Sequence, residues 1–169
     1  MRVLVDEEMI RNRVKELADE IRSKYRDGKL VVIIVLKGAF MFGADLIREL
    51  SDLDLEVDFI RASTYGMGTE PGEEVKILLE PTINIEGERV LIVDDILDTG
   101  CTLSRIRDYI ISKKPASCEI CVLLDKPERR RIDINADYVG FKIPNHFVFG
   151  YGIDWAEKYR NLRYIAYKA

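Results

Sequence analysis

Histidine, tryptophan and cysteine are scarce in this chain of 169 residues, and their scarcity excludes several kinds of site. His146 is the only histidine, and Cys118 and Cys121 are the only cysteines close to one another in sequence, so a zinc site is not expected. Residues three apart on a strand point to opposite faces, so a redox pair is not expected either. Three cysteines without an export signal predict reduced thiols in a cytoplasmic protein.

Long hydrophobic runs and an excess of positive charge are also missing. No apolar run approaches the ~20 residues of a membrane-spanning helix, so no membrane partner is expected. The net charge is −4, from 26 basic and 30 acidic residues, whereas non-specific nucleic-acid binders are usually basic. The run Arg129-Arg130-Arg131 is typical of a solvated surface, and an RNA-contact patch is the alternative. We therefore expect no nucleic-acid partner.

The alternation of helical and strand patterns predicts one domain over residues 1–169. Continuous apolar runs such as 30–36 and 90–93 are typical of strands buried on both faces. We therefore expect an α/β fold: a mainly parallel twisted sheet flanked by helices on both faces. Helices are expected from Asp6 to about residue 26, at 39–50 and at 103–111, and strands at 30–36, 55–62, 75–79, 90–93, 119–124, 138–141 and 163–167.

Polar residues follow three of these strands. Ligands of parallel sheets bind beyond the carboxyl ends of the strands. The candidate positions are therefore Lys37-Gly38, the segment from Asp94 to Thr102, and Asp125-Lys126.

The segment from Asp94 to Thr102 is the most informative in the sequence. A buried strand delivers Asp94 and Asp95 to the edge of the sheet, and Asp98 follows three residues later. Thr99, Gly100 and Thr102 then begin a helix, whose first N–H groups favour a phosphate. One loop thus offers acceptors for sugar hydroxyls or a metal beside donors for a phosphate, which is what a sugar phosphate requires. The alternative is a solvated strand end with a capped helix.

Two other nucleotide sites do not fit the sequence. A P-loop would need G-x-x-x-x-G-K-[ST], which is absent. A Rossmann site would need G-x-G-x-x-G between a strand and a helix, and Gly66 and Gly68 lack that spacing.

The segment from Asp94 to Thr102 closely resembles the phosphoribosyl-pyrophosphate signature of type I phosphoribosyltransferases. The chain as a whole resembles the hypoxanthine-guanine branch of that family up to about Tyr167. The resemblance implies the type I fold, with a small hood formed mainly by the C-terminal segment and the N-terminus. It implies Mg²⁺ as cofactor, and a dimer or tetramer. One departure is visible, because Asp94 stands where the family often has glutamate.

The resemblance also implies an activity. The chain would transfer a phosphoribosyl group from phosphoribosyl pyrophosphate to hypoxanthine or guanine in purine salvage, giving IMP or GMP and pyrophosphate. Two alternatives stay open: a nucleotide-binding RNA regulator with the same fold, and a transferase that prefers xanthine.

Roles for single residues follow from the same resemblance. Asp98 would be the catalytic residue that handles the purine's proton. Asp94, Asp95 and Asp154 would meet the metal, and the two adjacent aspartates would also face the ribose hydroxyls. The other substrate-binding residues implied are Leu36, Lys37 and Gly38 (pyrophosphate, with a cis peptide before the lysine), Thr64 and Tyr65 (a closing loop), Asp98, Thr99, Gly100 and Thr102 (5′-phosphate), Lys126, Phe147 and Val148 (purine), and Asp154 and Arg160 (pyrophosphate).

The residue type at Lys126 adds a reason of its own. A lysine ammonium only donates hydrogen bonds. Aimed at the exocyclic oxygen of a purine, it favours hypoxanthine, guanine or xanthine over adenine, which presents an amino group there.

Overall fold

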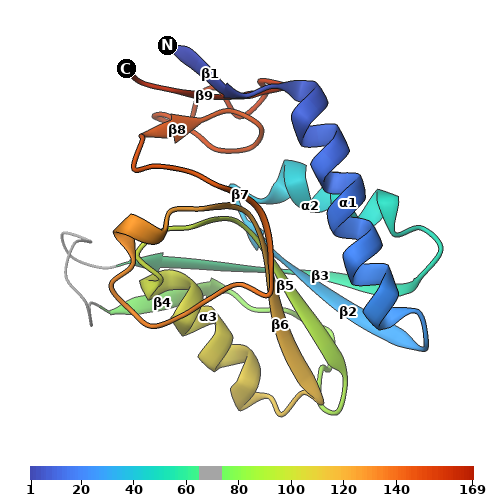
Figure 1. The fold of residues 1–169 in the computed structure, drawn as a ribbon. Helices are drawn as coiled ribbons and strands as arrows, with labels where there is room; N and C mark the ends of the chain where they lie inside the picture. Colours follow the sequence, from blue (N-terminus) through green and yellow to red (C-terminus); the bar gives the residue numbers. More distant parts are fainter. Residues whose placement is uncertain (65–73) are drawn as a thin grey trace.

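The computed structural model describes residues 1–64 and 74–169, which form a large sheet, a small sheet and the helices that cover the large one (Figure 1). The helices are α1 (Glu7–Tyr25), α2 (Phe40–Glu49), α3 (Cys101–Ser112) and a short 3₁₀ turn, η1 (Pro127–Arg129). The large sheet contains β2 (Lys29–Leu36), β3 (Asp54–Thr64), β4 (Val75–Leu79), β5 (Arg89–Leu97), β6 (Ser117–Asp125) and β7 (Tyr138–Lys142). The small sheet contains β1 (Arg2–Val5), β8 (Val148–Phe149) and β9 (Ile165–Tyr167).

The large sheet has the strand order β4-β3-β2-β5-β6-β7, and β4 alone runs antiparallel to its neighbour. Parallel pairing holds the strands in register: Ile34 lies opposite Val93, and Leu97 lies opposite Asp125. Strands β2, β5 and β6 therefore end at the same edge of the sheet.

Each face of this sheet has its own hydrophobic core. Val32 and Ile34 of β2 pack in the cluster that contains the apolar stripes of α1 and α2. Val31 and Ile33 point the other way and pack with the buried residues of α3. The alternation follows from the two-residue period of a strand, and it buries β2 on both sides. The fold class expected from the sequence is confirmed.

The two cysteines of β6 show the same alternation. Cys121 is buried in the cluster under α1, whereas Cys118 packs against the cluster under α3. Both thiols are free, and burial raises the pKa of Cys118 to about 11. The expectation that these cysteines face opposite ways is confirmed.

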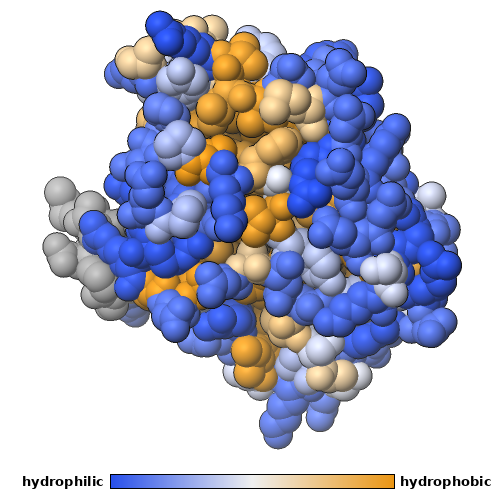
Figure 2. Space-filling model, viewed as in Figure 1, coloured by the Kyte–Doolittle hydropathy of each residue, from blue (hydrophilic) through white to orange (hydrophobic). Residues whose placement is uncertain are grey.

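The small sheet, in the order β1-β9-β8, brings the two chain termini together above the large sheet (Figure 1). We call β1, β8, β9 and the turns between β7 and β9 the hood. Strands β1 and β8 have four and two residues, too few for a recognisable pattern, and the sequence did not predict them. Figure 2 shows hydrophobic side chains at the surface in a band between the hood and α1, while most of this face is hydrophilic.

Several strand boundaries differ by one or two residues from those expected, and the end of β5 differs most. Strand β5 continues four residues beyond Val93, because Asp94, Ile96 and Leu97 still pair with β6. Strand β9 begins at Ile165 rather than at residue 163. None of the helices in the described part of the chain has the length and apolar character needed to cross a membrane.

Two arginines of α1 hold this helix against its neighbours: Arg13 contacts β7, and Arg22 contacts the end of α2. Arg13 donates from Nε to the carbonyl oxygen of Gly140 (2.9 Å) and from a terminal nitrogen to that of Val139 (2.7 Å). These carbonyls belong to β7, the edge strand, so Arg13 satisfies backbone acceptors that would otherwise be available to another strand.

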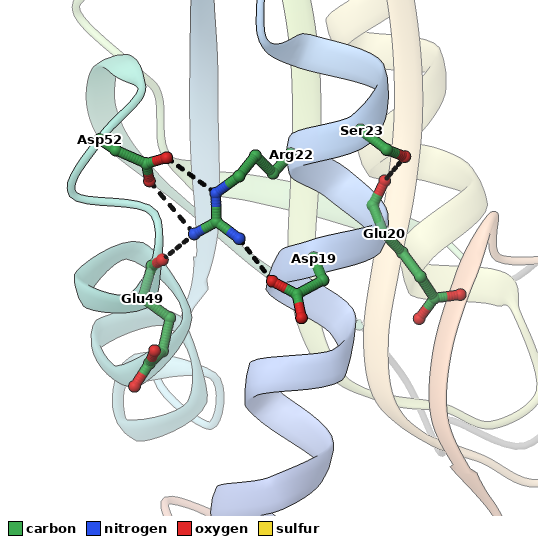
Figure 3. Close-up of polar contacts among 6 residues, drawn as sticks. All are labelled: Asp19, Glu20, Arg22, Ser23, Glu49 and Asp52. Atoms are coloured by element: carbon green, nitrogen blue, oxygen red, sulfur yellow. Dashed lines mark hydrogen bonds and ion pairs between the residues drawn. The ribbon is translucent and has the colours of Figure 1, made fainter.

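Arg22 joins α1 to the end of α2 (Figure 3). Its guanidinium donates to both carboxylate oxygens of Asp52 (2.8 and 3.1 Å), to Asp19 (2.5 Å) and to the carbonyl oxygen of Glu49 (2.6 Å). The hydrogen bond and charge of Arg22 hold the pKa of Asp52 below its ordinary value. One planar group thus meets three acceptors on two elements.

We predict that Arg22→Ala lowers the melting temperature by about 2–4 °C, because it removes these hydrogen bonds. Arg48→Ala is the matched control, since Arg48 on α2 is 81% exposed and lies 3.9 Å from Asp45. Thermal unfolding at neutral pH compares the two variants. An aspartate with a lowered pKa stabilises the fold above that pKa, so the effect of Arg22→Ala should shrink as the pH falls through it. Equal melting temperatures for Arg22→Ala and the wild type would contradict the prediction.

Candidate active site

Residues at the carboxyl ends of β2 and β5 and at the start of α3 line one cavity of about 260 Å³. Parallel register explains the convergence, since these strands end at the same edge. Eight residues expected from the sequence to bind substrate line this cavity: Leu36, Gly38, Asp94, Asp95, Asp98, Thr99, Gly100 and Thr102.

Two adjacent carboxylates, of the buried Asp94 and the partly exposed Asp95, form one wall of the cavity. Asp94 is only 7% exposed, and burial together with the charge of Asp95 raises its pKa well above the ordinary value. The Asp94 carboxylate accepts a hydrogen bond from the N–H of Asp95 (2.8 Å). Two neighbouring acids in a poorly solvated place attract a hard cation or sugar hydroxyls, which relieve their repulsion.

These carboxylates fit the Mg²⁺ that the family implies. In the described residues, no three His, Cys, Asp or Glu side chains converge as a complete metal site. Mg²⁺ does not require one, because it commonly binds through one or two carboxylates, waters and substrate phosphates.

The loop after β2 touches the carboxylate pair. A methyl group placed on Gly38 would lie 2.0 Å from Oδ2 of Asp95, so only glycine leaves this carboxylate where it is. The Leu36–Lys37 peptide bond is cis, as the resemblance implies. The hood reaches the same loop, because a side-chain carbon on Gly152 would lie 2.5 Å from the carbonyl oxygen of Gly38.

The turn before α3 is open to an anion. Gly100 has φ +92°, a left-handed conformation that favours glycine, and Ile134 packs so closely that a methyl group there would lie 2.6 Å away. Within the described residues, Gly100 supplies no side-chain cap for the helix, and the nearest hydroxyl, of Thr99, accepts from Cys101 N at 3.4 Å. Donors of the first helical turn thus remain for a phosphate.

Lys126 lies beside this turn. Its N–H donates to the carbonyl oxygen of Leu97 (2.9 Å), and the residue is only 7% exposed. Burial lowers the pKa of its ammonium, while the negative charge of Asp98 acts in the opposite direction. A buried lysine next to the cavity is better explained by recognition of an acceptor than by a solvated surface role.

Aromatic residues of the hood surround Phe147, which is 52% exposed. Its ring packs edge-on against Trp155, with ring centres 5.8 Å apart. Trp155 in turn packs against Phe149 at 5.3 Å. Val148, the next residue, is buried in β8. The Phe147 ring is thus held in place by Trp155 and is still half-exposed, as stacking on a planar base requires.

An acidic side chain joins the two cations expected to meet pyrophosphate. Glu157 pairs with Lys37 (3.1 Å) and with Arg160 (3.1 Å), and these bonds hold the pKa of Glu157 below its ordinary value. Arg160 also donates to the carbonyl oxygen of Gly152 (2.7 Å) and lies 3.6 Å from Asp154. Lys37, Asp154 and Arg160 therefore belong to one charged cluster at the hood.

Two predicted side chains lie outside the described residues, and three charged residues at the site were not predicted. Tyr65 lies outside the described residues, and so does the side chain of Thr64. Glu157 was missed, although its spacing of three from both Asp154 and Arg160 was a signal. Arg129 and Arg130, interpreted as a surface run, contact Asp98 and its backbone (3.0 and 2.8 Å).

A family model described as the phosphoribosyl transferase domain matches residues 4–156. The chain belongs to the phosphoribosyltransferase family. Its cavity between the β2 loop and the β5–α3 turn is therefore the candidate active site of a phosphoribosyltransferase.

Individual relatives agree with this assignment. The chain is 50% identical to the hypoxanthine-guanine phosphoribosyltransferase of Aquifex aeolicus over 163 residues, covering 96% of this chain and 91% of the relative. It is 48% identical to that of Bacillus subtilis, covering 97% and 91%. Among solved structures, a hypoxanthine-guanine phosphoribosyltransferase of Bacillus anthracis is 48% identical with a TM-score of 0.96, covering 100% of this chain and 99% of the other.

We predict that Gly38→Ala lowers the activity of this phosphoribosyltransferase by about 10-fold or more, because the new methyl group displaces the Asp95 carboxylate. Gly87→Ala is the control: a methyl group at Gly87 would meet nothing within 4 Å, although the positive φ of 73° there, unlike the backbone of Gly38, strains an alanine. Steady-state transferase kinetics and thermal unfolding of both variants test this. Equal activity losses in the two variants would contradict the prediction, because a methyl group at Gly87 meets no other atom.

Proposed function

We propose that this protein is a purine-salvage enzyme that transfers the phosphoribosyl group of phosphoribosyl pyrophosphate to hypoxanthine or guanine. The products would be IMP or GMP and pyrophosphate. The observation that carries the proposal is the cavity in which the carboxylates of the buried Asp94 and of Asp95 meet an open helix N-terminus. A ribose phosphate needs both kinds of partner. The relatives named above carry this activity in their names.

In this reaction a purine nitrogen forms a bond to C1′ of the ribose, and the bond from C1′ to pyrophosphate breaks. The pyrophosphate leaves with the bonding electron pair. Asp94 and Asp95 orient the ribose hydroxyls and stabilise the positive charge that develops on the sugar. The turn from Asp98 to Thr102 binds the 5′-phosphate through backbone N–H groups and hydroxyls.

The base is bound on the other side of the same turn. Lys126 donates to the exocyclic oxygen, Phe147 stacks on the ring, and the Val148 backbone meets its edge. Asp98 accepts the proton that the purine nitrogen loses.

Pyrophosphate is bound by the loop Leu36-Lys37-Gly38 and by Arg160. Lys37 and Arg160 are already held together through Glu157, so an anion of two phosphates finds its cations in place. Thr64 and Tyr65 would cover the reacting centre and exclude water. Asp94, Asp95 and Asp154 would hold Mg²⁺, which neutralises the leaving pyrophosphate when bound.

The test is a panel of bases. Pyrophosphate release is measured from phosphoribosyl pyrophosphate with hypoxanthine, guanine, xanthine and adenine in turn, with Mg²⁺ and with a chelator. We expect release with hypoxanthine or guanine, none with adenine, and none with the chelator. Release with xanthine alone would favour the xanthine alternative, and no release with any base would reject the proposal.

We predict that Asp98→Asn lowers kcat with hypoxanthine by about 10²–10⁴-fold, because an amide cannot accept the proton. Asp98→Asn keeps the size and a carbonyl acceptor for Arg129, so binding of phosphoribosyl pyrophosphate should persist. Asp133→Asn is the control; Asp133 is exposed in the loop after the arginine run. Unchanged turnover in Asp98→Asn would remove Asp98 from its role.

We predict that Lys126→Gln narrows the preference for hypoxanthine over adenine by about 10-fold or more. A hydrogen bond to a charged group contributes about 1.5–3 kcal/mol, and a glutamine amide can donate or accept. Lys142→Gln is the matched control, because Lys142 is exposed at the end of the neighbouring strand β7. The ratio of kcat/KM for the two bases is the measurement, and an unchanged ratio would contradict the assignment.

The RNA-regulator alternative loses its main support in the fold. Arg130 is only 16% exposed and pairs with Asp125 (2.6 Å), and Arg129 pairs with Asp98 (3.0 Å). The run that suggested an RNA contact is therefore largely engaged within the protein. The resemblance further implies a dimer or tetramer, which sedimentation equilibrium would decide.

A further inference from the structure

The arginine run after β6 wraps around the turn that carries Asp98. The guanidinium of Arg130 donates to the carbonyl oxygens of Asp98 (2.8 Å) and Leu97 (3.3 Å). From its other nitrogens it donates to the carbonyl oxygen of Ile134 (2.9 Å) and to the Asp125 carboxylate (2.6 Å). All three nitrogens of the group are therefore used.

The next residue of the turn is held by a separate set of contacts. The backbone N–H groups of Arg131 and Ile132 donate to the carbonyl oxygen of Thr99 (2.9 and 3.2 Å). Ile134 packs against Gly100, where a methyl group would come within 2.6 Å of it. Thr99 thus has backbone contacts of its own, whereas Gly100 also lies near the Arg130 side chain, whose Cδ would be 3.4 Å from a methyl group there.

The position of Arg130 joins two parts of the site. Asp125, its ionic partner, is 6% exposed at the end of β6 and directly precedes Lys126. Two of the three backbone acceptors of Arg130 are the carbonyl oxygens of Leu97 and Asp98. A rigid, planar cation with partners on both sides fixes the distance between them, which a flexible ammonium cannot do.

We propose that Arg130 is a positioning residue for the transfer reaction: it sets the orientation of Asp98 relative to a base bound at Lys126. This inference rests on the proposed function, in which Asp98 accepts the purine's proton. Arg130 does not touch substrate; it acts through the backbone of Asp98. Arg129, in contrast, meets the Asp98 carboxylate in a pair whose side chains are 43% and 39% exposed, and such pairs contribute little because water screens them.

The experiment compares Arg130→Lys with Arg131→Lys. Arg131 is the matched control, since its guanidinium has no hydrogen bond or ion pair with any other part of the chain described here, while its N–H is unaffected. We expect Arg130→Lys to lower kcat with hypoxanthine by about 10–100-fold, because a shift of about 1 Å in a reacting group can cost that much. KM for phosphoribosyl pyrophosphate should change less than about 3-fold, since Thr99 keeps its own backbone contacts and lysine keeps the Cδ carbon beside Gly100. If Arg130→Lys does not fold, Arg130→Gln is measured in the same way.

A double mutant separates positioning from general stability. If Arg130 acts through Asp98, Arg130→Lys should have little further effect on kcat in the Asp98→Asn background. Additive losses, a kcat within 3-fold of wild type, or parallel changes in kcat and KM with a lower melting temperature would each overturn the proposal. The wild type is assayed alongside: if it transfers nothing to any base, the proposed function has failed, whereas an active wild type with any overturning outcome sinks the positioning role alone.

Discussion

Parallel pairing of β2, β5 and β6 is the constraint on which the rest of this structure depends. Each of these strands is buried on both faces, so the only places where it can carry polar groups are its ends. Parallel register puts the carboxyl ends at one edge, with Ile34 opposite Val93 and Leu97 opposite Asp125. The Leu36-Lys37-Gly38 loop, the carboxylates of Asp94 and Asp95, and Lys126 are thereby brought to one edge of the sheet, where the proposed function assigns them to pyrophosphate, ribose and purine.

What could be predicted from sequence is what depends on local pattern. Continuous apolar runs predicted the central strands β2 and β5, and the order of acids, glycine and threonines predicted the turn from Asp94 to Thr102 that lines the cavity. The two short hood strands could not be predicted, because β8 has only two residues and exists by pairing with β9. The contacts of Arg130 with Asp98 and of Glu157 with Lys37 could not be predicted, because these partners lie on other elements, although the spacing of Glu157 from Asp154 and Arg160 was a signal.

The extension of β5 shows how tertiary pairing overrides local chemistry. Asp94 and Asp95 are poor strand residues, and their charges favour water. Pairing with β6 nevertheless carries the strand through them to Leu97. The result is a pair of carboxylates held in a poorly solvated place, where the pKa of Asp94 rises and a cation or hydroxyl partner becomes favourable.

The charges around the cavity explain how an acidic protein can bind an anionic substrate. The net charge is −4, so long-range attraction does not favour a pyrophosphate. Lys37 and Arg160, however, are held ready by Glu157, whose side chain is 66% exposed. An incoming pyrophosphate would replace one anion by another, and the released carboxylate would return to water. Binding then requires no ordering of flexible surface cations. The return of the Glu157 carboxylate to Lys37 and Arg160 would help the product to leave.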